Sequence, residues 1–119
     1  MSPPVSRRII TATLTPLDDE DRLHLPGLEA HLDDQYQAGI RKLLIAGTMG
    51  LMPLLPDQTW KDLVRSTARL NNGRFELLIG ATDHSTTRML QRIKFLNGID
   101  KIDGVTVMTP CFLKFTVAQ

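Results

Sequence analysis

The residues best placed for chemistry are Gly47, Thr48, Met49 and Gly50, which directly follow a short apolar run at residues 42–46. Such a run is typical of a buried β-strand, because it is too short for a helix and ends at glycine. In α/β proteins the turn after a buried strand carries free backbone N–H groups, and glycine lets a ligand approach them closely. We therefore predict that residues 47–50, the 47–50 loop, bind a small anionic ligand. The alternative is that the Thr48 hydroxyl only caps the turn.

The other polar side chains form no comparable pattern. His24, His31 and His84 are too scattered for a metal triad. The acidic residues 18–21 lack the alternating ligands and fixed glycine of a calcium loop, so we expect a solvated turn there. Cys111 has no histidine nearby and is expected to pack as a small apolar side chain. We predict no metal site and no cofactor.

The 47–50 loop belongs to an alternating series of strands and helices. Four short β-rich runs, at residues 9–14, 42–46, 75–79 and 105–108, start about 30 residues apart, which is the length of one strand–helix unit. Between them lie three segments with helical period, bounded by residues that start or stop helices. The predicted helices lie between Leu25 and Gly39, between Pro56 and Gly73, and between Ser85 and Gly98.

Strands that alternate with single helices predict a parallel sheet with right-handed crossovers. A (β/α)₈ TIM barrel takes about 250 residues, and the 119 residues of this chain supply about half of its units. We therefore predict an α/β fold in which residues 1–119 form the N-terminal portion of a single TIM-barrel domain, in a chain that looks cut short. The alternative is an open doubly wound sheet that binds a phosphate at the 47–50 loop. Its first strand–helix turn should be glycine-rich, whereas this one carries Pro16 and acidic residues.

Charge and hydropathy argue against several classes of partner. Fourteen basic and thirteen acidic residues give a net charge of +1, and no segment concentrates either sign, so nothing favours nucleic acid or an anionic membrane. No apolar run approaches the roughly 18 residues that span a bilayer. The single cysteine cannot form an internal disulfide, and no signal peptide opens the chain. We expect a soluble, cytoplasmic protein that acts on a small molecule.

Short motifs at the predicted strand ends follow a recognisable order. They read Ala12-Thr13-Leu14-Thr15-Pro16-Leu17, Gly47-Thr48-Met49-Gly50, Gly80-Ala81-Thr82 and Met108-Thr109-Pro110-Cys111-Phe112. Their order and spacing resemble the Schiff-base aldolases and lyases typified by dihydrodipicolinate synthase and N-acetylneuraminate lyase. The similarity covers essentially the whole chain.

The resemblance implies a (β/α)₈ barrel with its chemistry at the carboxyl ends of the strands. In this family a lysine on the sixth strand forms an imine with pyruvate or another 2-keto acid, and the glycine–threonine loop binds the substrate carboxylate. Thr48 matches the first threonine of that loop and would position the substrate or relay a proton. The imine-forming lysine and a tyrosine of the fifth strand are expected beyond Gln119. Lys42 begins a strand and points to the opposite face, and Lys114 lies in a loop without an apolar pocket, so neither is placed for an imine.

Three positions depart from the family pattern. Met49 stands where the loop usually has a second threonine, so one hydroxyl ligand of the carboxylate is missing. Leu51 replaces a glutamate, and Phe112 replaces a tyrosine of a proton relay that crosses between subunits; a phenyl ring cannot carry a proton. Phe112 is therefore expected only as a subunit contact in a homodimer or homotetramer. These changes favour a divergent lyase of the family, and the alternative is a non-catalytic barrel protein that has lost synthase activity.

Overall fold

The structure, a computed structural model, describes residues 9–109 of the chain. A single parallel sheet contains β1 (Thr11–Ala12), β2 (Lys42–Ile45), β3 (Glu76–Gly80) and β4 (Gly104–Thr106) in sequence order. The connections contain the helices α1 (Leu25–Gln37), α2 (Asp57–Asn71) and α3 (Thr86–Asn97) and the 3₁₀ helix η1 (Met52–Leu54). Cys111, Phe112 and Lys114 lie outside the described residues.

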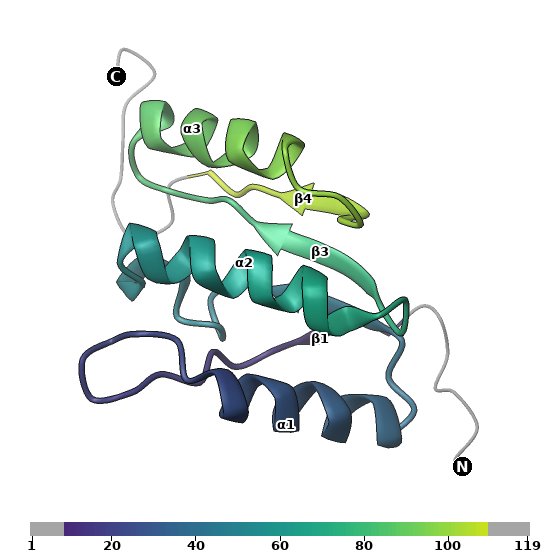
Figure 1. Cartoon of the computed structure of the whole chain (residues 1–119). Helices are drawn as coiled ribbons and strands as arrows, with labels where there is room; N and C mark the ends of the chain where they lie inside the picture. The colour runs from purple at the N-terminus through teal and green to yellow at the C-terminus, as the bar shows by residue number, and fades with distance from the viewer. Residues whose placement is uncertain (1–8, 110–119) are drawn as a thin grey trace.

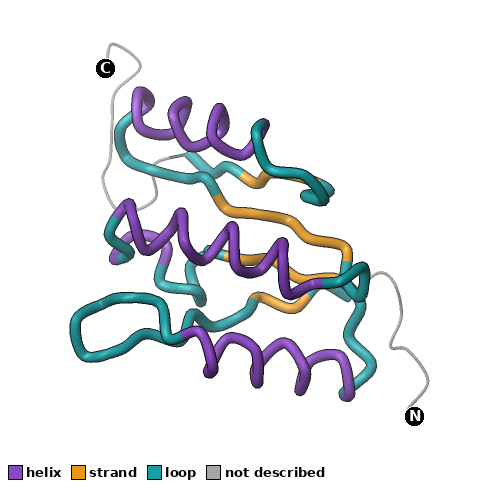
Figure 2. Tube along the Cα trace, in the orientation of Figure 1, coloured by secondary structure: helices purple, strands orange, loops and turns teal. Residues whose placement is uncertain are grey.

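The three α-helices cover the same face of the sheet, as Figures 1 and 2 show. A doubly wound sheet carries helices on both faces and reverses its strand order. A barrel instead keeps its strands in sequence order and has all its helices outside. The order β1-β2-β3-β4, with helices on one face, is that of half a barrel. The predicted N-terminal half of a (β/α)₈ barrel is confirmed, and the doubly wound alternative is wrong.

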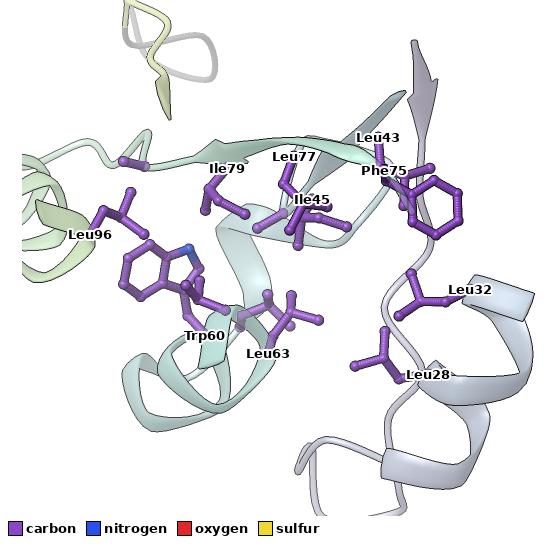
Figure 3. Packing of buried hydrophobic residues seen from close by; sticks show 14 residues of the cluster. Leu28, Leu32, Leu43, Ile45, Trp60, Leu63, Phe75, Leu77, Ile79 and Leu96 are labelled. Atoms are coloured by element: carbon purple, nitrogen blue, oxygen red, sulfur yellow. The ribbon is translucent and has the colours of Figure 1, made fainter. Parts of the chain in front are cut away.

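The core lies between the sheet and the helices. Leu43 and Ile45 of β2 pair with Leu77 and Ile79 of β3, and all four side chains are buried. Because successive side chains of a strand point to opposite faces, their sequence neighbours face away from the helices. Figure 3 shows the four leucines and isoleucines packed with helix side chains. The other residues that it labels are Leu28, Leu32, Trp60, Leu63, Phe75 and Leu96.

The helix ends follow local signals in the sequence. Gly39, just after α1, has a left-handed φ of +90°, and Asn72 and Gly73, just after α2, have φ values of +50° and +75°. Ser85 is the N-cap of α3, and its side chain accepts a hydrogen bond from the N–H of Arg88 at 3.3 Å. The predicted limits of the three helices are confirmed.

The first strand is shorter than predicted. The sequence predicts a strand over residues 9–14, but only Thr11–Ala12 form β1. This strand lies at an edge of the described sheet and pairs with β2 alone. Its ladder ends where the N–H and the hydroxyl of Thr13 both donate to the carbonyl of Leu44, each at 3.1 Å.

The third and fourth strands are displaced by about one residue from their predicted ranges. β3 begins at Glu76, because both backbone polar groups of Phe75 bond the side chain of Asn71, at 2.7 and 2.9 Å. The fourth strand is predicted at residues 105–108 and observed at Gly104–Thr106. Side-chain partners of the Phe75 backbone groups therefore explain where β3 begins.

Candidate active site

The 47–50 loop leaves β2 through a left-handed turn. Ala46, directly after the strand, has a φ of +57°. Beyond it, the N–H groups of Gly50 and Met52 both donate to the carbonyl of Gly47, at 3.0 and 3.2 Å. The loop is thus a closed turn that folds back on itself at the carboxyl end of β2.

Several donors of this loop have no partner within residues 9–109. There, the N–H groups of Gly47, Thr48 and Met49 and the hydroxyl of Thr48 take part in no hydrogen bond. Thr48 is exposed, so a ligand can reach its hydroxyl. Successive N–H groups in a turn form a concave site for an anion, and a hydroxyl adds a donor without adding charge. The loop has the chemistry required to bind a carboxylate.

Thr15 fastens the loop to the chain that follows β1. Its buried hydroxyl donates to the carbonyl of Gly50 at 2.6 Å, across 35 residues of sequence. A Cβ on Gly50 would lie 3.1 Å from that hydroxyl oxygen and 3.1 Å from the carbonyl oxygen of Thr13, which is tighter than most Cβ contacts. Glycine at this position therefore lets the loop pack against the end of β1.

A second set of bonds holds the end of β3. The indole N–H of Trp60 donates to the carbonyl of Gly80 at 3.0 Å, and Nη1 of Arg92 donates to the carbonyl of Thr82 at 3.3 Å. The Thr82 hydroxyl accepts from the N–H of Met108 at 2.8 Å, which ties the chain after β3 to the chain after β4. No local sequence pattern indicates these contacts of Trp60 and Arg92.

The loop opens on a hollow of about 260 Å³ at the carboxyl ends of the strands. Leu44 lines it and points away from the core, so the hollow lies on the helix-free face of the sheet. Gly47, Thr48 and Met49 line it as well, whereas Gly50 packs against the end of β1. The other lining residues are Ala12, Ala46, Met52, Gly80, Thr82, Thr106 and Met108.

A smaller pocket, of about 120 Å³, adjoins the hollow through Met52 and Thr82, which line both. In it, Nη2 of Arg88 lies 2.8 Å from the carboxylate of Asp83, and the N–H of Ser85 donates to the same carboxylate at 2.7 Å. Partial burial acts to raise the pKa of Asp83, but the hydrogen bonds from Arg88 and Ser85 outweigh it and hold the pKa below the ordinary value of 3.8. The carboxylate therefore stays ionised at neutral pH.

The three histidines lie on separate segments. His24 is the N-cap of α1, where its Nδ1 accepts from the N–H of Gly27 at 3.0 Å. His31 lies within α1, and His84 lines the smaller pocket. In the part of the chain that the structure describes, no group of three His, Cys, Asp or Glu residues is arranged to hold a metal ion. The sequence does not predict His24 as an N-cap, because Ser, Thr, Asp and Asn are the usual N-cap residues.

Asp18 and Lys42 have structural roles, as the sequence predicts. The Asp18 carboxylate accepts from the N–H groups of Glu20 and Arg22, at 2.8 and 3.0 Å. These two bonds lower the pKa of Asp18 and define the solvated turn expected for the acidic run. Lys42 pairs with Glu76 at 3.1 Å, at the amino ends of their strands. Its amine is therefore at the opposite end of β2 from the 47–50 loop.

The chain matches known proteins along almost its whole length. The sequence profile of the dihydrodipicolinate synthetase family matches residues 5–119. A curated relative, the 4-hydroxy-tetrahydrodipicolinate synthase of Koribacter versatilis, is 27% identical over 106 residues. The alignment covers 89% of this chain and 35% of the relative, so the chain spans about a third of that protein's length.

Two solved structures share the fold. The N-acetylneuraminate lyase of Proteus mirabilis superposes with a TM-score of 0.82 at 20% identity, over 90% of this chain and 36% of the lyase. The E. coli K12 prophage protein YagE belongs to the dihydrodipicolinic acid synthase family and was solved in complex with pyruvate. It superposes with a TM-score of 0.82 at 24% identity, over 92% of this chain and 36% of YagE. With the profile match over residues 5–119, the chain belongs to the dihydrodipicolinate synthetase family.

Proposed function

We propose that the full-length protein is a carbon–carbon lyase that acts on pyruvate or another 2-keto acid through a lysine Schiff base. The observation that carries this proposal is the 47–50 loop. The N–H groups of Gly47, Thr48 and Met49 and the Thr48 hydroxyl are unpaired within residues 9–109 and adjoin a hollow at the strand ends. In barrel enzymes this end of the strands carries the active site. A keto-acid carboxylate is the group that such donors would bind.

In the proposed complex the substrate carboxylate accepts hydrogen bonds from the loop N–H groups and from the Thr48 hydroxyl. Hydrogen bonds to a charged acceptor are shorter and roughly twice as strong as neutral ones. The donors carry no full charge, so they orient the carboxylate without repelling a positive imine beside it. The bond from Thr15 to the Gly50 carbonyl fixes the loop before substrate arrives, which reduces the cost of ordering it on binding.

The chemistry would begin at a lysine that the family pattern puts beyond residue 119. Its neutral amine attacks the keto carbon; a C–N bond forms, the keto oxygen leaves as water, and a protonated imine results. The imine withdraws electrons, so a proton leaves C3 and an enamine forms. The enamine then forms a C–C bond with an aldehyde. The reverse sequence of steps breaks such a bond. The Thr48 hydroxyl would relay a proton at this stage. Water finally releases the product from the lysine.

Met49 lowers the affinity expected for pyruvate. Its side chain is 60% exposed at the wall of the hollow and offers no hydroxyl where the family pattern has a second threonine. One hydrogen bond to a charged group is worth about 1.5–3 kcal/mol, so its loss raises the dissociation constant roughly tenfold or more. A non-catalytic member of the family would tolerate methionine at position 49, so this residue is also consistent with the non-catalytic alternative.

Borohydride trapping tests the proposal. The full-length protein is incubated with pyruvate, reduced with sodium borohydride, digested and analysed by mass spectrometry. We expect one lysine to gain the mass of pyruvate, less one water, plus two hydrogen atoms, because reduction converts the imine to a stable amine. A sample without borohydride should show no adduct. Absence of the adduct at saturating pyruvate would instead support the non-catalytic alternative.

We further propose that the protein works in the cytoplasm as a homodimer or homotetramer, with Phe112 at a subunit contact. Phe112 lies outside the described residues, and the family pattern alone supports this role. Among residues 9–109, no helix has the length and apolar character to cross a bilayer. Light scattering during gel filtration measures the mass of the full-length protein, and a fully active monomer would contradict the oligomer.

A further inference from the structure

We propose that the hollow takes a 2-keto acid whose chain beyond the keto group is apolar and longer than the methyl group of pyruvate. This inference rests on the proposed function and narrows its substrate class. It follows from the side chains that form the wall around the 47–50 loop.

Apolar side chains form most of this wall. Met49 from the loop, Met52 from η1 and Met108 beyond β4 line the same space, and Leu44 adds its side chain from β2. Met49 and Met108 both line the hollow, so their apolar surfaces face its interior. An apolar ligand that covers them releases the water in contact with both surfaces, which favours binding.

The polar groups of the wall are few and uncharged. Thr48, Thr82 and Thr106 line the hollow, and none of the described lining residues carries a charge. The Thr82 hydroxyl already accepts the N–H of Met108 at 2.8 Å. The 47–50 loop therefore provides for one carboxylate, and the described wall provides no cation for a second.

Two arginines near the site are engaged elsewhere. Arg88 lies in the smaller pocket, where it pairs with Asp83 at 2.8 Å. Arg92 is 7% exposed, and its Nη1 donates to the carbonyl of Thr82 at 3.3 Å. Neither lines the hollow. A second carboxylate would find no cation among the described lining residues, and an unpaired charge against this apolar part of the wall opposes binding.

A longer apolar chain has the opposite effect. Each methylene group that leaves water for an apolar contact strengthens binding severalfold. Methionine is unbranched and flexible, so Met49 and Met52 can adjust to chains of different length. Affinity should therefore rise from pyruvate to 2-oxobutanoate and to 2-oxopentanoate.

The sharpest comparison is between 2-oxopentanoate and 2-oxoglutarate, which share a five-carbon chain and differ in a terminal methyl or carboxylate group. Each is titrated against the full-length protein, and the concentration that gives half-maximal borohydride trapping is measured, with pyruvate as the reference. We expect this concentration to be at least tenfold lower for 2-oxopentanoate than for 2-oxoglutarate. It should also be severalfold lower for 2-oxopentanoate than for pyruvate.

Two variants of Met49 test whether the wall causes this preference. Met49→Thr removes apolar surface and adds a hydroxyl, so the preference for 2-oxopentanoate over pyruvate should fall severalfold. Met49→Leu keeps an apolar side chain and should retain the preference. Met49 is not part of the core formed by the described residues, so neither change removes packing from that core.

The outcomes separate this inference from the function on which it rests. Equal trapping of 2-oxopentanoate and 2-oxoglutarate, or an unchanged preference in Met49→Thr, overturns the inference. A pyruvate adduct in the same experiment would leave the proposed function standing. If no keto acid gives an adduct, both this inference and the proposed function are contradicted.

Discussion

The carbonyl group of Ala46 occupies the space that a side chain at Gly80 would need. A Cβ added to Gly80 would overlap the Ala46 carbonyl oxygen and lie 2.9 Å from its carbonyl carbon, closer than real Cβ contacts come. The chain after β2 and the end of β3 therefore meet backbone to backbone. Because Ala46 directly precedes the 47–50 loop, Gly80 sets how closely the base of the loop packs on β3.

Gly80→Ala should disturb both stability and binding in the full-length protein. We expect a loss of about 1–3 kcal/mol in the free energy of unfolding, the usual cost of an overpacked site, and weaker pyruvate binding because the loop moves. Gly98→Ala is the matched control, since Gly98 has a φ of −88° and its added Cβ would meet only the carbonyl oxygen of Phe95, at 3.5 Å. Urea unfolding compares the two variants, and equal effects would contradict the role assigned to Gly80.

Trp60→Phe should destabilise the protein through a lost donor and through the cavity left at a fully buried position. Phenylalanine keeps most of the apolar surface but leaves the buried carbonyl of Gly80 without the indole N–H that now bonds it at 3.0 Å. A buried acceptor without a partner costs about 1–3 kcal/mol. Tyr36→Phe is the control, because the Tyr36 hydroxyl makes no hydrogen bond within the described residues. Thermal unfolding measures both variants, and an equal fall in melting temperature in the two would contradict the role of this bond.

Thr15→Val should loosen the 47–50 loop. Valine has nearly the shape of threonine but cannot donate to the Gly50 carbonyl, which now accepts the Thr15 hydroxyl at 2.6 Å. We expect a loss of about 1–3 kcal/mol in stability, together with weaker pyruvate trapping. Thr15→Ser keeps the hydroxyl and should recover most of both. If valine and serine behave alike, the hydroxyl does not hold the loop.

Acid should remove the contribution of Asp83 to stability. Its folded pKa lies below the ordinary value of 3.8, so folding favours the ionised form. The contribution is present above pH 3.8 and is lost as the pH falls through the lowered folded value. The difference in unfolding free energy between the wild type and Asp83→Asn should therefore be constant at about pH 5–7 and shrink below the ordinary pKa. A difference of the same size at about pH 2 would contradict the ion pair with Arg88.

Features of the fold that depend on residues close in the sequence could be predicted, whereas features that depend on contacts between distant residues could not. Ser85 accepts a backbone N–H three residues away, and Asn72 adopts the left-handed conformation that ends α2, so helix ends are visible in a single sequence. Strand limits depend on partners elsewhere. Thr13, at the end of the first ladder, bonds the carbonyl of Leu44, 31 residues away.

The same distinction holds for the candidate site. The glycines and threonine of the 47–50 loop stand together in the sequence, so the loop could be located there. The bond that holds it could not, because Thr15 and Gly50 are 35 residues apart and no periodicity connects them. Met52 and Met108 belong to different strand–helix units, so their shared wall also becomes visible only in the folded chain.

The affinity of Thr48 variants for pyruvate tests the central claim most directly. Thr48 is exposed among the described residues, so its replacement removes no core packing there. Calorimetric titration of the full-length protein should show a dissociation constant raised roughly tenfold or more in Thr48→Val, because one hydrogen bond to a charged group is lost. Thr48→Ser keeps the hydroxyl and should stay within about threefold of the wild type. Pyruvate binding by Thr48→Val that equals that of the wild type would contradict the assignment of the 47–50 loop as the carboxylate site.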